Sequence, residues 1–151
     1  MLASPLKKSL IAAAVSAYML AGASFANSTT ALPPLQHSGA HSYVTGGIGL
    51  DESSAFRRAM NDWPLSLRFA EKDGMKARYV ADVQVHVTDE NGKTAISAKS
   101  EGPFMLIKVP AGTYKIDATL GGQSLHQRAE VKNGQPAKIT FLWPARTDET
   151  H

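Results

Sequence analysis

Apolar and polar residues alternate with a period of two through most of the chain from Leu65 to Trp143. Val83, Val85 and Val87, for example, alternate with polar residues. Successive side chains of a β-strand point to opposite faces of the sheet, so this alternation predicts strands with one buried face. Strands are predicted over residues 65–70, 81–88, 94–99, 104–109, 114–120, 125–131 and 137–143, with a further short one over 42–49.

Turn-forming residues separate these predicted strands at intervals of about eight to twelve residues, a rhythm typical of an antiparallel sandwich or barrel. Glycine tolerates a positive φ, and proline presets a φ that suits the start of a turn. We therefore predict a mainly β fold, an antiparallel β-sandwich of about seven strands with one N-terminal helix packed on it. The turn signals are Asp73-Gly74, Asn91-Gly92, Pro110-Ala111-Gly112, Gly121-Gly122 and Asn133-Gly134.

Before this region, over Glu52–Asp62, the apolar residues follow the period of a helix. Asp51 is placed as the N-cap, and Pro64 is expected to end the helix because its ring disfavours helical geometry at the preceding residue. Residues spaced by three and four form a single apolar stripe, which predicts a helix that lies on an apolar surface. The stripe consists of Phe56, Ala59, Met60 and Trp63.

Residues 1–26 have the order of a cleavable secretory signal peptide. Lys7 and Lys8 precede an uncharged apolar run over 10–22, and Ser24 and Ala26 are the small residues expected before a cut at Asn27. A membrane-spanning helix needs about 20 apolar residues, and this run is shorter. We therefore expect export, a periplasmic or secreted location, and no transmembrane segment after processing.

The processed chain is expected to be nearly neutral, because the signal peptide carries two lysines and no acidic residue. It keeps 14 Lys and Arg against 13 Asp and Glu. A neutral surface lacks the electrostatic footprint of a nucleic-acid-binding protein, so no nucleic-acid partner is predicted. The chain has no cysteine, which excludes a disulfide framework and a thiolate site.

Four further segments are predicted after residue 26. Residues 27–41 are polar, carry Pro33-Pro34 and show no periodicity, which predicts a disordered leader. Residues 42–76 form a front segment with a short strand, the helix and a strand. Residues 77–144 hold the remaining strands of the sandwich, and residues 145–151 are expected to be a loose tail.

From Tyr79 onward the chain resembles the carboxypeptidase regulatory-like domain, a transthyretin-like β-sandwich. The family pattern Gly-x-Phe is matched at Gly102-Pro103-Phe104. The pattern Leu-Pro-x-Gly-x-Tyr-x-Leu is matched from Val109 to Ile116, with Val109 in place of the first Leu and Ile116 in place of the last. The resemblance covers about half of the processed chain. It implies a transthyretin-like sandwich of the kind that serves as an accessory module, and related sandwiches bind carbohydrate; similarity of fold does not transfer function.

Motifs for catalysis and metal binding are sparse. The chain has no G-x-S-x-G, no H-E-x-x-H and no cysteine nucleophile. Gly46-Gly47-Ile48-Gly49 lacks the Gly-Lys-Ser/Thr ending of a phosphate loop and is interpreted as a flexible turn. We predict no enzyme activity, no cofactor and no bound metal. Only geometry can decide whether two of the carboxylates Asp82, Asp89 and Asp117 form a catalytic pair.

Two pairs of histidines need a structural test. His37 and His41 have a spacing that lets two side chains share a metal on a helix, but the leader shows no helical pattern and a zinc site needs three or four ligands. His86 and His126 fall on the polar faces of two predicted strands and can cooperate if those strands pair. Both pairs are interpreted as solvated side chains.

The aromatic residues are the remaining candidates for a binding site, because a ring face can pack on a sugar. Trp63, Trp143 and Tyr79 are the candidate ligand-binding residues, although the patterns also place Trp63 in the helix stripe and Trp143 on an inward strand face. The leading hypothesis is a non-catalytic exported module that recognises a protein partner or an envelope component such as a glycan. The alternatives are carbohydrate or small-ligand binding through exposed aromatics, and an enzyme with an unrecognised site.

Overall fold

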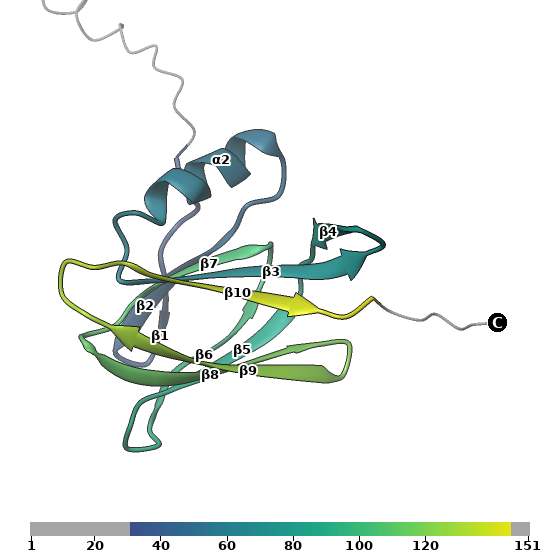
Figure 1. Ribbon diagram of the computed structural model, residues 1–151. Coiled ribbons are helices and arrows are strands. Elements are labelled where there is room, and N and C mark those ends of the chain that lie inside the picture. Colours follow the sequence, from purple (N-terminus) through teal and green to yellow (C-terminus); the bar gives the residue numbers. More distant parts are fainter. Residues whose placement is uncertain (1–30, 146–151) are drawn as a thin grey trace, which may run out of the picture.

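The computed structural model describes residues 31–145, which form two β-sheets stacked as a sandwich, with one short helix on the outside (Figure 1). The chain is therefore mainly β with a helix packed on a sandwich, as predicted. We call the larger sheet, with strand order β1-β2-β7-β3-β10 and β4 attached to β3, sheet A. Its strands are β1 (Gln36–Ser38), β2 (His41–Gly46), β3 (Leu65–Asp73), β4 (Lys76–Tyr79), β7 (Phe104–Lys108) and β10 (Ala137–Trp143).

The smaller sheet, sheet B, has the order β6-β5-β8-β9 and is antiparallel throughout. Its strands are β5 (Val83–Thr88), β6 (Thr94–Ser100), β8 (Gly112–Leu120) and β9 (Gln123–Val131). The structure thus has more strands than the seven expected. One pair also departs from the antiparallel prediction, because β10 lies parallel to β3.

The main core lies between the two sheets and contains the residues that the alternation placed inside. Val83, Val85 and Ile116 are fully or almost fully buried, and Phe141 and Trp143 meet them from β10. The two-residue period of the sequence therefore marked the inner faces correctly. Tyr114 also lies in this core, and its hydroxyl donates a hydrogen bond to the carbonyl oxygen of Pro110 at 2.7 Å.

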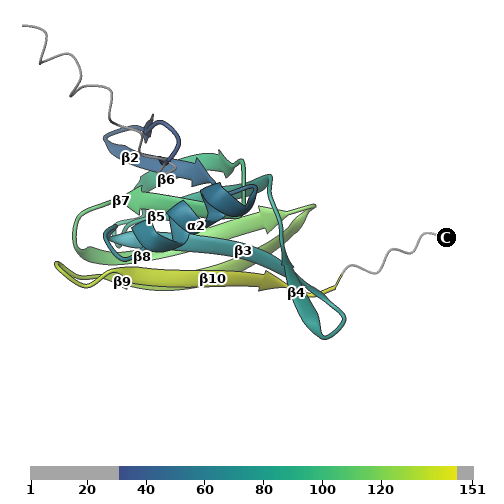
Figure 2. The same ribbon diagram turned by 90° about the horizontal axis from the view of Figure 1, so that it is seen from above.

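Helix α2 (Leu50–Ala59) packs on the face of sheet A that is turned away from sheet B (Figure 2). Strand β7 is consequently buried on both sides, which agrees with its continuous apolar run. Met105 and Ile107 point to the main core, whereas Phe104 and Leu106 point to the helix. The helix-side cluster, as we call this second group of buried residues, consists of Val44, Phe56, Met60, Phe104 and Leu106.

The ends of the helix differ from the prediction. Gly49 is the N-cap and no side chain caps the helix there, so Asp51 lies inside the first turn. The helix ends at Ala59, with Met60 as the C-cap, rather than at Asp62 next to Pro64. The start has a physical reason, because Gly49 has a φ of 94° that turns the chain from β2 into the helix.

The predicted division into segments also needs correction. Gln36–Ser38 forms β1 and pairs with β2, so the described part of the 27–41 leader contributes a strand. The expected boundary between 42–76 and 77–144 lies inside the β3–β4 hairpin, and β7 lies between β2 and β3. The two segments therefore share one sheet. The predicted signal peptide over residues 1–26 and residues 146–151 of the predicted tail lie outside the described residues. Within residues 31–145, no helix has the length and apolar character needed to cross a membrane.

Candidate functional site

Trp143 is a core residue and is not available for ligand stacking. Its side chain is 1% exposed, and its indole Nε1 donates a hydrogen bond to the carbonyl oxygen of Gln123 at 2.9 Å. Its ring centroid lies 6.3 Å from that of Phe69 and 6.1 Å from that of Phe141. A buried, hydrogen-bonded indole is a packing element, so Trp143 lies in the core, as its inward strand face predicted, and presents no ring face to a ligand.

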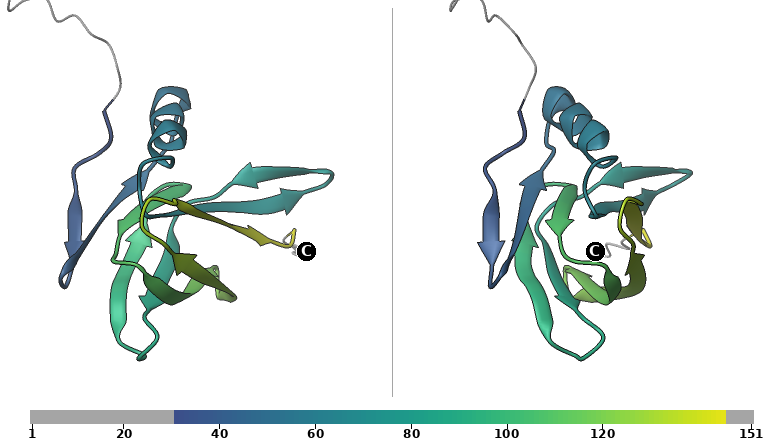
Figure 3. Two further views of the ribbon diagram at one scale, coloured as in Figure 1. Left: turned by 60° about the vertical axis from the view of Figure 1, so that its left-hand side comes forward. Right: turned by 90° about the vertical axis from the view of Figure 1, so that its left-hand side faces the viewer.

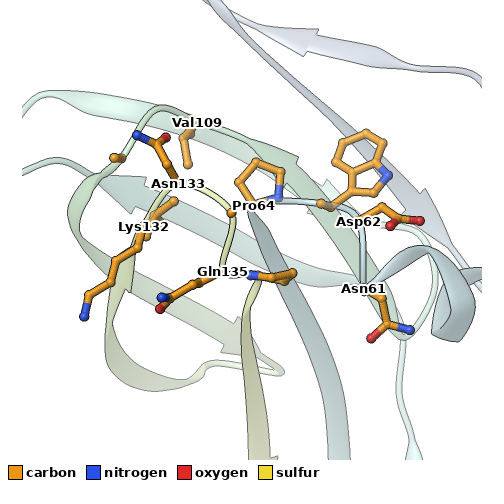
Figure 4. A pocket seen from close by; sticks show the side chains of 12 residues that line it. Asn61, Asp62, Pro64, Val109, Lys132, Asn133 and Gln135 are labelled. Carbon is orange, nitrogen blue, oxygen red and sulfur yellow. The ribbon is translucent and has the colours of Figure 1, made fainter.

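Trp63 lies just beyond α2 and is half-buried against the helix-side cluster. The ammonium group of Lys108 lies 5.1 Å from the centroid of its ring, within the range of a cation–π contact. Trp63 also borders a hollow of about 260 Å³ at one end of the sandwich. In Figure 4, Asn133 and Gln135 lie on one side of this hollow, Asn61 lies on the other, and Pro64 lies between them.

Tyr79 is the predicted candidate that remains well exposed, at 46% of its surface. It lies at the end of β4, and its ring centroid is 5.3 Å from that of Phe104 in a tilted arrangement. It lines a groove of about 560 Å³ that Trp63 and Trp143 do not line. The three predicted site residues therefore do not form one site.

This helix–hairpin groove, as we call it, lies between the start of α2 and the end of the β3–β4 hairpin. Ile48 is 65% exposed and Leu50 is 77% exposed, and both line the groove together with Tyr79. Arg57 is the single charged residue of the lining. The full lining is Gly47, Ile48, Gly49, Leu50, Ser53, Arg57, Tyr79, Val80, Ala81 and Pro103.

Glycines shape the wall of the groove next to the helix. Gly47 has a φ of 99°, and a Cβ atom added there would collide with the ring of Phe104. The backbone N–H of Gly47 donates to the carboxylate of Glu52 at 2.8 Å, which ties the loop to the first turn of α2. The Gly-Gly-Ile-Gly sequence was expected to be a flexible turn, but these contacts hold it in place and leave Ile48 exposed. Sequence reasoning noted the turn but missed its role, because Ile48 belongs to no periodic pattern.

An ion pair holds the other wall. In the β3–β4 hairpin, the guanidinium of Arg78 donates to the carboxylate of Glu71 at 2.8 Å. Glu71 is 2% exposed, and its hydrogen bond and negative charge raise the pKa of Arg78 above its ordinary value. The turn predicted at Asp73-Gly74 is centred on Gly74 and Met75, with a φ of 66° at Gly74. The hairpin thereby keeps Tyr79 in place beside α2.

Within residues 31–145, the histidines and acidic residues do not gather into a metal centre. His86 and His126 both lie opposite Asp117 in the register of β5, β8 and β9, so β8 separates the two histidines. The His126 ring nitrogen Nδ1 is 2.6 Å from an oxygen of Asp117. Asp82 and Asp89 lie at opposite ends of β5 and do not pair. No group of three or more His, Asp or Glu residues in the described range is arranged to hold a metal ion.

Comparisons with protein-family models, with curated proteins and with solved structures found no match to this chain. The resemblance to the carboxypeptidase regulatory-like domain therefore stays a prediction. The most specific motif of this resemblance, from Val109 to Ile116, has a structural role. The hydrogen bond that Tyr114 donates to Pro110 closes the turn before β8. That role concerns folding and carries no information about a ligand.

Proposed function

We propose that the protein is a non-catalytic exported binding module that recognises a protein partner or another component of the cell envelope. The proposed binding surface is the helix–hairpin groove. The carrying observation is that three strongly exposed apolar side chains, Ile48, Leu50 and Tyr79, line one hollow. Single exposed apolar residues are ordinary, but a group of them around a concavity is typical of a binding site.

The shape of the groove supports a partner that brings apolar side chains. Burying Leu50 and Ile48 against such a partner removes apolar surface from water, at about 25 cal/mol for each Å². Both residues belong to a loop and helix start that Gly47 and Glu52 hold in place. A preformed wall lowers the ordering cost of binding.

Site-specific photocrosslinking tests this proposal in cells that produce the protein. A photoreactive amino acid at Leu50 is expected to yield a discrete crosslinked product. The same amino acid at Lys99, an exposed position on sheet B, serves as the matched control and is expected to yield none. Leu50→Asp should leave the free energy of unfolding within about 0.5 kcal/mol, because the side chain is exposed. No product from position 50, or equal products from both positions, would reject the groove as the binding surface.

The hollow beside Trp63 supports carbohydrate binding as a second candidate function. It combines an aromatic ring with polar side chains, among them Asn61, Asn133 and Gln135. Trp143 is buried, so a change of tryptophan fluorescence on titration with cell-wall fragments would report mainly on Trp63. A saturable change that Asn133→Ala weakens would favour this function, and an unchanged spectrum across the panel would reject it.

A further inference from the structure

Strand β4 has a partner on one side only. Within residues 31–145, β4 pairs with β3 and with no other strand, and all four of its residues are exposed. Figure 3 shows the β3–β4 hairpin projecting beyond the rest of the sandwich. Strand β7 begins at Phe104, directly after Pro103 of the groove lining, and β4 borders the same groove through Tyr79.

The open edge presents backbone groups in the spacing of a sheet. Gly74 and Met75 form a two-residue connection, so Asp73 and Lys76 are a hydrogen-bonded pair and hydrogen-bonded pairs alternate from there. The hydrogen bond from Val80 N to the carbonyl oxygen of Phe69, at 3.2 Å, continues this alternation. The N–H and C=O groups of Ala77 and Tyr79 must therefore point away from β3. These are the groups that an added strand would bind.

The two faces of β4 differ in chemistry. Tyr79 lies opposite Ala70 in register and points to the helix side, where Ile48 and Leu50 are exposed. Lys76 and Arg78 alternate with it along the strand and lie on the opposite face. The charge of Arg78 is partly compensated by Glu71, whereas Lys76 forms no salt bridge within residues 31–145. Tyr79 is thus the large apolar side chain of the face beside the groove. On the other face Lys76 and Arg78 line the open edge, and the acidic Asp73 and Glu71 lie opposite them on β3.

We propose that an extended segment of a partner protein binds β4 as an additional strand, and that apolar and acidic side chains alternate along this segment. The apolar side chains would enter the helix–hairpin groove, and the acidic ones would lie beside Lys76 and Arg78. This inference rests on the proposed function, and it adds the mode of binding and the class of partner. Backbone hydrogen bonds would supply affinity, and the two faces would supply specificity.

Two other occupants fit the edge less well. A second copy of the chain would bring Lys76 and Arg78 of both copies to neighbouring strands, where like charges repel. The chain's own residues 146–151 contain no large apolar side chain to fill the groove. Charge and apolar surface together therefore favour an acidic, alternating segment of another protein.

The binding mode is tested with synthetic peptides and the intact processed protein. The probe is a fluorescently labelled heptapeptide of alternating valine and glutamate, and its binding is followed by fluorescence anisotropy. The matched controls are a valine–lysine peptide and a valine–glutamate peptide N-methylated at alternate residues, which blocks one backbone edge. We expect both controls to bind at least tenfold more weakly than the probe.

Two variants test the protein side. Ala77→Pro removes an outward-pointing N–H without removing a bond to β3, and proline is tolerated at such edge positions. It should weaken probe binding at least tenfold, and Lys76→Glu should weaken it severalfold while improving the valine–lysine peptide. Should Ala77→Pro fail to fold, as judged by circular dichroism, Lys76→Glu and the N-methylated peptide still decide the question.

The outcomes separate this inference from the proposed function. Equal binding of the N-methylated peptide, or no binding of the probe, overturns strand addition even where photocrosslinking at Leu50 still identifies a partner. A tenfold gain in probe affinity after removal of residues 146–151 assigns the edge to the chain's own tail. A dimer in sedimentation that Lys76→Glu alters assigns it to a second copy. Either result also overturns the inference.

Discussion

The two faces of sheet A differ in how completely they are buried. The inner face meets sheet B in a sealed core, where Leu65, Leu67 and Phe69 are completely buried. The outer face is covered in part by α2, which packs on β2 and β7. Beyond the helix, Tyr79 and Leu142 lie on that face in one row on either side of Ala70, and both remain exposed.

This difference indicates which face of sheet A stabilises the fold and which face can bind a partner. Burial of apolar surface is the main favourable term in folding, so the inner face supplies most of the stability. The helix side adds a smaller cluster and leaves apolar side chains uncovered, which is what a binding surface requires. Substitutions on the inner face are therefore expected to affect mainly stability, and substitutions on the exposed part of the outer face mainly binding.

The largest expected effect comes from a charge in the sealed core. Val85→Asp places a carboxylate where the wild-type side chain is 1% exposed, and we expect a loss of about 4–5 kcal/mol in the free energy of unfolding. Urea denaturation followed by circular dichroism measures it. Gln84→Asp, the exposed neighbour on the opposite face of β5, is the control and should change stability by about 0.5 kcal/mol at most. Cooperative melting of Val85→Asp at the wild-type temperature would contradict the assignment of the core.

A paired substitution of two buried phenylalanines sharpens the comparison. Phe56 and Phe141 are both 0% exposed, but Phe56 stacks on Phe104 under the helix, whereas Phe141 lies between the sheets. Substitution of phenylalanine by alanine costs about 3–5 kcal/mol, and less where the site can collapse. A surface helix moves more easily than a paired strand, so Phe56→Ala should fall near 3 kcal/mol and Phe141→Ala near 5 kcal/mol. Equal losses in denaturant unfolding would show that the helix side is as rigid as the core.

The smallest of these effects concerns Tyr114 and depends on pH. Burial, followed by the negative charges of Asp89 and Glu90, raises the pKa of the Tyr114 hydroxyl above its ordinary value. Because the pKa is higher in the folded state, the contribution of the Tyr114 hydroxyl to the free energy of unfolding is complete below pH of about 10. It declines as the pH rises through the folded-state pKa.

Tyr114→Phe removes this contribution together with the hydrogen bond to Pro110. We expect a loss of about 1 kcal/mol at neutral pH and a shallower decline of stability above pH of about 10. Denaturant unfolding at a series of pH values provides the measurement. Tyr79→Phe, at an exposed position, is the control and should leave stability at neutral pH nearly unchanged. An unchanged pH profile in Tyr114→Phe would refute the role of burial.

Much of the fold could be predicted because its signals are local. The alternation in Val83, Val85 and Val87 identified β5 and its inner face, and Asp73-Gly74 identified the turn of a hairpin. Of the candidate site, only Tyr79 could be predicted from the sequence. The exposure of a site residue depends on which elements pack over it, and this is set by the tertiary structure. Ile48 and Leu50 carry no periodic signal, and their exposure follows from the turn at Gly47 and Gly49.

The sequence by itself determined the mainly β character, the inner faces of the strands and the position of one amphipathic helix, since these depend on neighbours within a few residues. Only the tertiary structure decided that β10 runs parallel beside β3 and that Gln36–Ser38 joins sheet A. It also decided that Trp143 is buried while Tyr79 lines a groove. Pairing between distant segments is set by the shared burial of their apolar faces, and that burial exists only once both sheets have closed on one core.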